Sequence, residues 1–256
     1  MTAIEPVSAP GRRKWHVAEV RELISETPHV KTLWLDVPDW PGHFAGQHLD
    51  VRLTAEDGYQ AQRSYSIASA PEEKFLSLTV EKVDGGEVSD YLTGDLRVGD
   101  KFEIRGPIGG YFVWRAEDGG PLLLIGGGSG IVPLMSMLRH RRNRKSDAAA
   151  SLLYSARTAQ DIIYRAELDA LSQGDPNLQI IQTLTREPAS VWPGHRGRIG
   201  QELISQNSPP PAANPKIYIC GSNGFVETAS QALIGLGYDA LSIRTERFGP
   251  SGSASQ

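Results

Sequence analysis

The chain has 256 residues, of which 39% are hydrophobic and 22% are charged, a composition typical of a folded globular protein with room for two domains. Its formal net charge of −4 argues against a general nucleic-acid-binding protein, which would show a basic excess. The single cysteine, Cys220, excludes a disulfide within the chain and a cysteine-ligated zinc or iron–sulfur centre, and we expect no metal site.

The first fourteen residues lack the apolar core of a signal peptide, and we expect residues 1–14 to form a flexible leader. The longest apolar run, in "PLLLIGGG", is too short to cross a membrane. The sequence therefore predicts a cytoplasmic protein without a membrane span.

Residues 15–115 contain about six short segments in which apolar and polar residues alternate with the period of a β-strand, among them "KTLWLDV", "LDVRL" and "FLSLTVEKV". The segment "RSYSIAS" is unusual, because it would carry Arg63 and Tyr65 on one face and Ser64 and Ser66 on the other. It is either a polar edge strand or a surface that receives something flat and negatively charged. Short antiparallel strands without long helices predict a small closed β-barrel.

From residue 121 onward, buried strands alternate with helical segments. "PLLLI" is followed by glycines and then by apolar residues at helical spacing, and the alternation continues to a last strand in "LSIRTERF". This pattern predicts an α/β domain with a doubly wound parallel sheet over residues 121–256. The boundary between the two domains is expected at "RAEDGG", residues 115–120.

The strongest motif of the second half is "LLLIGGGSGIVP". It places Gly128, Ser129 and Gly130 between a buried strand and a helix, where backbone amides and the helix N-terminus form an anion site. Ile131 stands where the G-x-G-x-x-G motif has its third glycine, so a tight packing turn is the alternative. "DGGEVSDYL" (84–92) is a weaker pattern of the same kind, and from its residues alone a plain hairpin loop is the better interpretation.

Other residues with possible chemistry have simple structural explanations. Cys220 ends the strand "KIYIC", where it is either a small buried apolar residue or part of a ligand site at the carboxyl end of a parallel strand. The six histidines show neither metal-ligand spacing on a helix nor a carboxylate partner that sequence spacing would place nearby, so we expect surface or packing roles. The basic run "RHRRNRK" (139–145) is expected to be a solvated helix C-terminus, with a docking patch for an acidic partner as the alternative.

In their order along the chain, "RSYS", "GGEVSDYL", "GPIGGYF", "GGGSGIVPL", "YSART", "YICG" and "ERFG" resemble motifs of the ferredoxin–NADP reductase superfamily of flavin oxidoreductases. They span nearly the whole chain. The resemblance implies an FAD-binding antiparallel β-barrel over residues 15–115, followed by a pyridine-nucleotide domain over residues 121–256. These are the two folds that the sequence patterns predict.

The resemblance implies flavin-binding roles for two motifs. In the first, Arg63 would bind the flavin phosphate, Tyr65 would lie against the isoalloxazine ring beside Ser64, and Ser66 would face the flavin N5 atom. The second would bind the pyrophosphate, which favours FAD over FMN, through Gly86, Val88 and Ser89. An aromatic side chain at Tyr111 or Trp114 would be available to the adenine.

The nucleotide-binding roles follow in the same way. The pyrophosphate loop of the nicotinamide nucleotide would comprise Gly128, Ser129 and Gly130. The pair beside the nicotinamide would be Cys220 and Gly221. NADPH, favoured over NADH, would have its 2′-phosphate bound by Arg157, Arg165 and Arg186, since arginine forks bind phosphates with two hydrogen bonds.

The resemblance places Glu246 and Phe248, from "ERFG", in the same pocket, with Phe248 covering the flavin until the nicotinamide displaces it. The catalytic set would thus comprise Ser66, Cys220, Glu246 and Phe248.

The implied function is that of an NAD(P)H-dependent flavoprotein reductase, which transfers hydride from NADPH (or NADH) to FAD and electrons to a separate redox protein such as a ferredoxin. With one cysteine, the chain is expected to lack the ferredoxin-like domain that many oxygenase reductases of this family carry. One alternative is a free-standing flavin or ferric-chelate reductase with a small-molecule acceptor. Another is an electron-transfer subunit of a larger complex.

Overall fold

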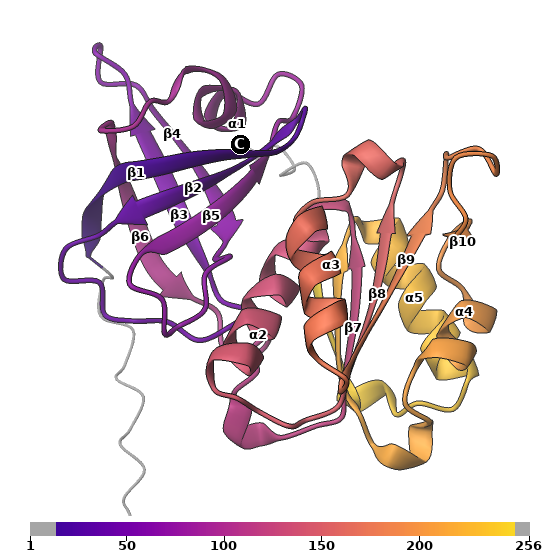
Figure 1. The fold of residues 1–256 in the computed structure, drawn as a ribbon. Helices are drawn as coiled ribbons and strands as arrows, with labels where there is room; N and C mark the ends of the chain where they lie inside the picture. Colours follow the sequence, from indigo (N-terminus) through magenta and orange to yellow (C-terminus); the bar gives the residue numbers. More distant parts are fainter. Residues whose placement is uncertain (1–13, 249–256) are drawn as a thin grey trace, which may run out of the picture.

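The computed structural model describes residues 14–248, which form an antiparallel and a parallel sheet of six strands each (Figure 1). The leader predicted for residues 1–14 lies outside the described residues except for Lys14, as does the end of the predicted second domain, residues 249–256. Within the described part, none of the helices has the length and apolar character needed to cross a membrane.

The antiparallel sheet has the strand order β4-β3-β6-β1-β2-β5. The single bridge between Ile67, just after β4, and Leu78 on β5 links its two edge strands and closes the sheet into a barrel. The short helix α1 (Glu87–Asp90) and a π-helical turn (Tyr91–Asp95) connect β5 to β6 and contact the barrel. The strands are β1 (Trp15–Thr27), β2 (Val30–Asp36), β3 (His48–Thr54), β4 (Gln60–Ser66), β5 (Leu76–Glu81) and β6 (Lys101–Ile108).

The alternation in the sequence explains why these segments pair. Leu33 and Leu35 on β2, and Leu49 and Val51 on β3, are fully buried inside the barrel, while polar neighbours point away from its core. A strand that is apolar on one face can bury that face only by closing around a shared interior. The predicted antiparallel barrel is confirmed.

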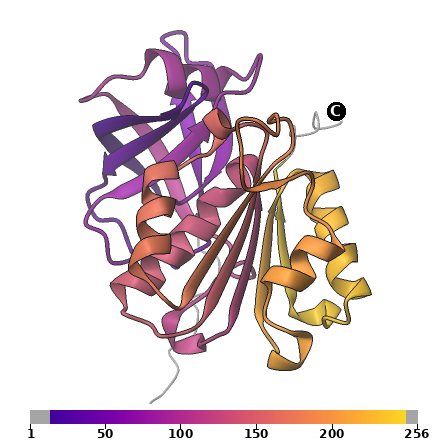
Figure 2. The ribbon, with the colours of Figure 1, turned by 45° about the vertical axis from the view of Figure 1, so that its right-hand side comes forward.

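The parallel sheet has the order β10-β9-β8-β7-β11-β12, so the chain reverses direction across the sheet between β7 and β11. Helices α2 (Ile131–Asn143) and α3 (Arg165–Gly174) cover one face, and α4 (Gln201–Asn207) and α5 (Asn223–Gly235) cover the other (Figure 2). The strands are β7 (Leu122–Gly127), β8 (Ala150–Ala156), β9 (Leu178–Leu184), β10 (His195–Arg196), β11 (Lys216–Gly221) and β12 (Ile243–Arg247).

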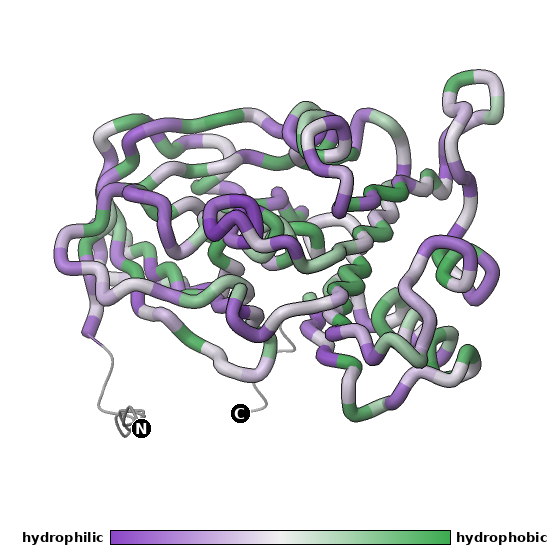
Figure 3. Tube along the Cα trace, turned by 60° about the horizontal axis from the view of Figure 1, so that its bottom comes forward, coloured by the Kyte–Doolittle hydropathy of each residue, from purple (hydrophilic) through white to green (hydrophobic). Residues whose placement is uncertain are grey.

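Burial on both faces explains the apolar runs of these strands: β7 and β8 are buried along almost their whole length, and hydrophobic residues gather along this sheet (Figure 3). The predicted doubly wound parallel sheet is confirmed. The barrel lies against the α2–α3 side, and Val30, Ala45 and Ala68 of the barrel half belong to the same hydrophobic cluster as α2.

The prediction of a solvated basic run at residues 139–145 is wrong for its first three members. Arg139, His140 and Arg141 are 5%, 7% and 2% exposed. Each has a carboxylate partner from a different part of the chain: Glu167, Glu72 and Asp175. Other elements cover this part of α2, so these three side chains pair with protein groups, while residues 142–145 are exposed as predicted.

Candidate functional site

The end of β4 places the side chains of the "RSYS" motif in different surroundings. The Arg63 guanidinium is exposed and donates through Nη1 to the Gln62 carbonyl oxygen at 2.7 Å, and among residues 14–248 it forms no ion pair with a carboxylate. Ser64 donates instead to Asp50 at 2.7 Å, and Asp50 is paired with Arg105. The structure therefore separates Ser64 from Arg63, and the predicted contact between Ser64 and the flavin stays a prediction.

Tyr65 and Ser66 lie deeper. The half-buried Tyr65 ring packs against the barrel core, and this burial raises the pKa of its hydroxyl to about 12, although nearby Arg63 acts in the opposite direction. Ser66 is 5% exposed, and its Oγ has no hydrogen-bond partner among the described residues. A buried hydroxyl without a partner costs free energy, which leaves the Ser66 Oγ available to a ligand or to an ordered water molecule.

The second predicted flavin motif forms the start of α1. Ser89 Oγ donates to the Gly86 carbonyl oxygen at 3.0 Å and accepts from the Val83 amide at 3.2 Å, so its hydroxyl shapes the turn. A Cβ at Gly86 would lie 2.5 Å from that Oγ, which requires glycine there. Contact with a phosphate would therefore come from the free backbone amides at the helix start, at Val88 and Ser89.

The two flavin motifs lie side by side in the fold. Helix α1 contacts β4, and the Tyr59 hydroxyl, just before β4, donates to Glu87 of α1 at 3.0 Å. An exposed guanidinium and a helix N-terminus are thus adjacent, an arrangement that suits a phosphate group.

The glycine-rich loop after β7 requires its glycines. Gly128 has φ +56°, in the left-handed region that favours glycine. A Cβ at Gly130 would lie 2.1 Å from the Cys220 carbonyl oxygen, so this loop packs directly on the end of β11. The Phe225 ring of α5 lies against both Gly127 and Gly221, with ring carbons 2.9 and 2.7 Å from the Cβ positions those glycines leave empty. Nothing in the local sequence around Phe225 pointed to this contact.

Cys220 and Glu246 are neighbours across β11 and β12. Burial raises the pKa of the Cys220 thiol well above its ordinary value, and the adjacent Glu246 raises it further. Burial also raises the pKa of Glu246 to about 7, and its Oε2 has no hydrogen-bond partner among the described residues. The Cys220 thiol is therefore neutral, and Glu246 keeps its proton to a much higher pH than an exposed glutamate does.

His48 connects this edge to the flavin strand. It pairs with Ser66 across β3 and β4, and its Nδ1 lies 3.6 Å from Glu246 Oε1. Sequence spacing indicated no carboxylate partner for His48, because that partner, Glu246, comes from the other half of the chain. The fold thus brings Ser66, Cys220 and Glu246 to one place, where the barrel meets the parallel sheet.

Phe248 directly follows β12. Its backbone amide donates to the Gly221 carbonyl oxygen at 2.9 Å, and its half-buried ring packs against the core shared by the two halves. Its proposed movement over the flavin stays a prediction.

The predicted adenine contact is wrong for Trp114. This side chain is fully buried, and its Nε1 donates to the Gly119 carbonyl oxygen at 3.0 Å. Tyr111 is 63% exposed and donates through its hydroxyl to the Ile243 carbonyl oxygen at 3.2 Å. Of the two aromatic residues, only Tyr111 has a surface that a ligand can reach.

The arginines predicted for the 2′-phosphate are all exposed. Arg157 and Arg186 follow the adjacent strands β8 and β9, and the Arg186 amide donates to the Arg157 carbonyl oxygen at 2.8 Å, so the structure brings these two together. Arg165 begins α3, after an intervening turn. Glu187, absent from the predicted site, lies beside this pair and accepts from the Ala159 amide at 2.7 Å.

Comparison with known proteins agrees with these two halves. Residues 18–113 match the family model of an oxidoreductase FAD-binding domain, and residues 124–231 match that of an oxidoreductase NAD-binding domain. The glycine betaine monooxygenase reductase subunit of Pseudomonas aeruginosa is 30% identical over 246 residues, which cover 92% of this chain and 65% of that protein.

A second relative is the ferredoxin–NAD(P)(+) reductase component of the naphthalene 1,2-dioxygenase/salicylate 5-hydroxylase systems of Ralstonia sp. It is 32% identical over 207 residues, which cover 81% of this chain and 61% of that protein. The chain therefore spans less than two thirds of the length of these two curated relatives, 65% and 61%.

Among solved structures, the flavohem-like FAD/NAD-binding domain of nitric oxide dioxygenase from Vibrio cholerae O1 has a TM-score of 0.80 to this chain at 24% identity. The match covers 92% of this chain and 99% of that one. At this identity the likeness establishes a common fold.

Proposed function

The chain belongs to the ferredoxin–NADP reductase superfamily of FAD- and NAD-binding oxidoreductases, and on that premise we propose that it is an NAD(P)H-dependent flavoprotein reductase that supplies electrons to a separate redox protein. One observation carries the proposal. Ser66, whose buried Oγ has no partner among the described residues, lies beside His48 on the neighbouring strand, and His48 contacts Glu246, the neighbour of Cys220 in the nucleotide half.

The residues at this junction fit FAD and a nicotinamide nucleotide. Bound FAD takes up two electrons from a reduced nicotinamide and passes them on one at a time. Arg63 and the amides at the start of α1 would hold the FAD phosphates, while the Ser66 hydroxyl would donate to the ring that lies against Tyr65. The neutral Cys220 thiol and the raised pKa of Glu246 reduce negative charge at the place where the nicotinamide would bind.

We assign the nucleotide pyrophosphate to the loop formed by Gly128, Ser129 and Gly130, at the start of α2, where the helix N-terminus favours an anion. NADPH is the proposed nucleotide. The support is the adjacent, exposed pair Arg157 and Arg186, which offers two guanidinium groups for the 2′-phosphate.

The proposed electron acceptor is a ferredoxin or a similar redox protein. The names of the two curated relatives describe reductase components of oxygenase systems. These 256 residues contain one cysteine, so they cannot ligate an iron–sulfur cluster through four thiolates, and the proposed acceptor is a redox group held outside them.

An anaerobic titration of the FAD-loaded protein with NADPH and, separately, with NADH tests the proposal. Bleaching of the flavin absorbance by NADPH at lower concentration than by NADH supports both the activity and the nucleotide. Ser66→Ala should retain FAD and bleach more slowly. A protein that takes up no FAD, or whose FAD neither nucleotide reduces, contradicts the proposed function.

A further inference from the structure

The strongest feature outside the cofactor sites is a buried polar seam between helix α2 and the segment that follows the flavin strand. This segment, residues 68–73, begins two residues after Ser66. Two side chains of α2 donate to backbone carbonyls of this segment. Ser136 donates through Oγ to the Ser69 carbonyl oxygen at 2.7 Å, and Arg139 donates through Nη1 to the Ala68 carbonyl oxygen at 2.8 Å.

A third contact extends the seam: His140 Nδ1 lies 2.8 Å from Glu72 Oε1. Ser136, Arg139 and His140 are spaced i, i+3 and i+4, so they share one face of α2. That helix begins directly after the glycine-rich loop, and Arg139 is nine residues beyond Gly130, about 13 Å along the helix axis. One rigid element therefore carries both the nucleotide loop and the contacts to the flavin strand.

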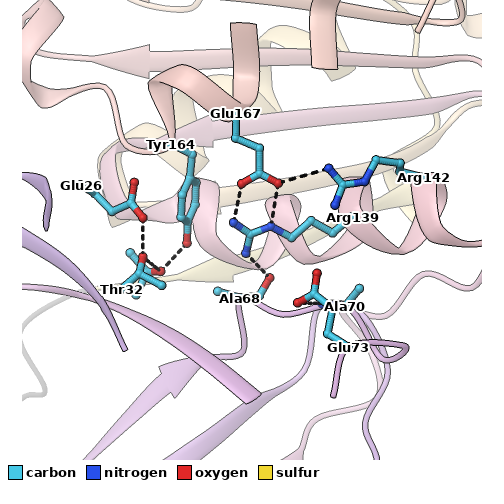
Figure 4. Close-up of polar contacts among 10 residues, drawn as sticks. Glu26, Thr32, Ala68, Ala70, Glu73, Arg139, Arg142, Tyr164 and Glu167 are labelled. Atoms are coloured by element: carbon cyan, nitrogen blue, oxygen red, sulfur yellow. Dashed lines mark hydrogen bonds and ion pairs between the residues drawn. The ribbon is translucent and has the colours of Figure 1, made fainter. Parts of the chain in front are cut away.

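Arg139 is the centre of this seam (Figure 4). Its Nε and Nη2 donate to the two carboxylate oxygens of Glu167 on α3, at 3.0 and 2.6 Å, while Nη1 holds the Ala68 carbonyl. Its guanidinium carbon lies 4.8 Å from the centre of the Tyr164 ring. Burial alone would lower the pKa of Arg139, but Glu167 keeps it above its ordinary value, so the group remains a cation.

Tyr164 extends the connection to the barrel. It is 3% exposed with φ +60°, and its hydroxyl donates to Thr79 on β5, which in turn is hydrogen-bonded to Thr32 on β2 at 2.8 Å. Helix α3 begins at Arg165, directly after this left-handed residue, which turns the Tyr164 ring toward the barrel side.

A buried ion pair such as Arg139–Glu167 is poor evidence for stability, because desolvation offsets most of the attraction, and an apolar side chain often fills the space equally well. What an apolar side chain lacks is the directional bond from Nη1 to the Ala68 carbonyl. That bond fixes the backbone next to Ser66 relative to the helix that starts at the nucleotide loop.

We infer that Arg139 is a positioning residue: its guanidinium ties α2 to the Ala68 carbonyl and thereby sets the placement of the nucleotide loop relative to the flavin strand. The expected effect on the rate of flavin reduction rests on the proposed function. There, a displacement of about 1 Å between reacting groups lowers a rate about 100-fold. The structural part of the inference, the fixed relation of the two domains, holds independently of any reaction.

The chain offers matched controls on the same helix. Arg141 is an equally buried arginine, but its partners, the Ala148 carbonyl oxygen and Asp175, belong to the nucleotide half. Arg142 is half-exposed and lies 3.7 Å from Glu167. When Arg139 is replaced, Glu167 therefore still has a cationic partner. Arg139→Met and Arg141→Met therefore both remove a buried guanidinium, and only the first cuts the connection between domains.

The test measures the distance between spin labels on exposed cysteines introduced at Val98, in the barrel half, and Leu241, in the nucleotide half; the native Cys220 is fully buried. The parent protein and Arg141→Met should give one narrow distance peak, and Arg139→Met should lose it. If Arg139→Met fails to fold, Arg139→Lys and Arg141→Lys provide the same comparison. Lysine keeps the positive charge but lacks the planar guanidinium that bonds Glu167 and the Ala68 carbonyl at once.

The kinetic readout uses the same variants loaded with FAD. Stopped-flow reduction by NADPH should show a limiting rate about 10- to 100-fold lower in Arg139→Met, with an unchanged nucleotide concentration at half-saturation, and the parental rate in Arg141→Met. Equal distance peaks in the two variants, or equal losses in both, overturn the inference. A parent protein that neither nucleotide reduces refutes the proposed function instead, while the distance measurement still decides the role of Arg139.

Discussion

Replacing Glu246 by glutamine is expected to stabilise the protein at high pH. The Glu246 side chain is 20% exposed, and burial raises its pKa to about 7 from an ordinary value of 4.5. In the unfolded chain the same carboxyl group titrates near its ordinary value. The folded state therefore holds a proton between these two pH values that the unfolded state has already lost.

The sign and size of the effect follow from that difference. The stability contributed by the neutral carboxyl group is fully present below pH 4.5 and is lost as the pH rises through about 7. At about 1.4 kcal/mol per pH unit, the free energy of unfolding falls by about 3 kcal/mol across this window. This value is an upper bound, because His48 lies 3.6 Å from Glu246 and, when protonated, favours the ionised carboxylate. Glutamine copies the neutral form at every pH.

Urea unfolding at pH 4.5, 6 and 8 measures the effect. Glu246→Gln should match the parent at pH 4.5 and exceed it by up to about 3 kcal/mol at pH 8. The control is Glu56→Gln, at an exposed position in the hairpin between β3 and β4, which should follow the parent at all three values. A Glu246→Gln protein whose stability parallels the parent at every pH would refute the reasoning that burial holds this carboxyl group neutral.

Further predictions concern the cofactor sites. Arg63→Ala should raise the FAD dissociation constant about 10- to 100-fold in a fluorescence titration, the loss of one charge-assisted hydrogen bond; unchanged affinity would remove Arg63 from the phosphate site. Gly130→Ala should lower Tm by roughly 10 °C or prevent folding, because its Cβ would lie 2.1 Å from the Cys220 carbonyl oxygen, and a parental melting curve would contradict this packing. Replacing Arg157 and Arg186 together by alanine should raise KM for NADPH about 100-fold with no change for NADH; similar changes for both nucleotides would argue against a 2′-phosphate site here.

Local sequence patterns were sufficient for the two folds. The alternation that includes Leu33 and Leu35 predicted a barrel strand, and the run before Gly126 predicted a buried parallel strand, because both patterns depend on residues that are neighbours in the chain. The plain hairpin loop preferred for residues 84–92 is wrong, because the structure forms the short helix α1 at Glu87–Asp90 there. The functional roles assigned to Arg63, Ser66 and the other site residues came from family resemblance and stay predictions until tested.

Errors arose where a side chain's partner is distant in sequence. Arg139 and His140 looked like a solvated helix end, yet their partners Glu167 and Glu72 are 28 and 68 positions away. A run of cations has the same sequence whether it faces water or another domain, so only the packed structure distinguishes the two. Trp114 was misjudged for the same reason, since the core that buries it comes from the other half of the chain.

By itself, the sequence determined the order and type of the two domains, the glycine-rich turn after β7 and the single cysteine of these 256 residues, because chain neighbours and composition decide these features. The tertiary structure alone decided that Ser66, Cys220 and Glu246 converge, and that α2 holds the backbone beside Ser66 through Arg139. The physical reason is that such contacts depend on how two separately folded sheets pack together. That packing is set by the shapes and charges of whole surfaces, which no local pattern records.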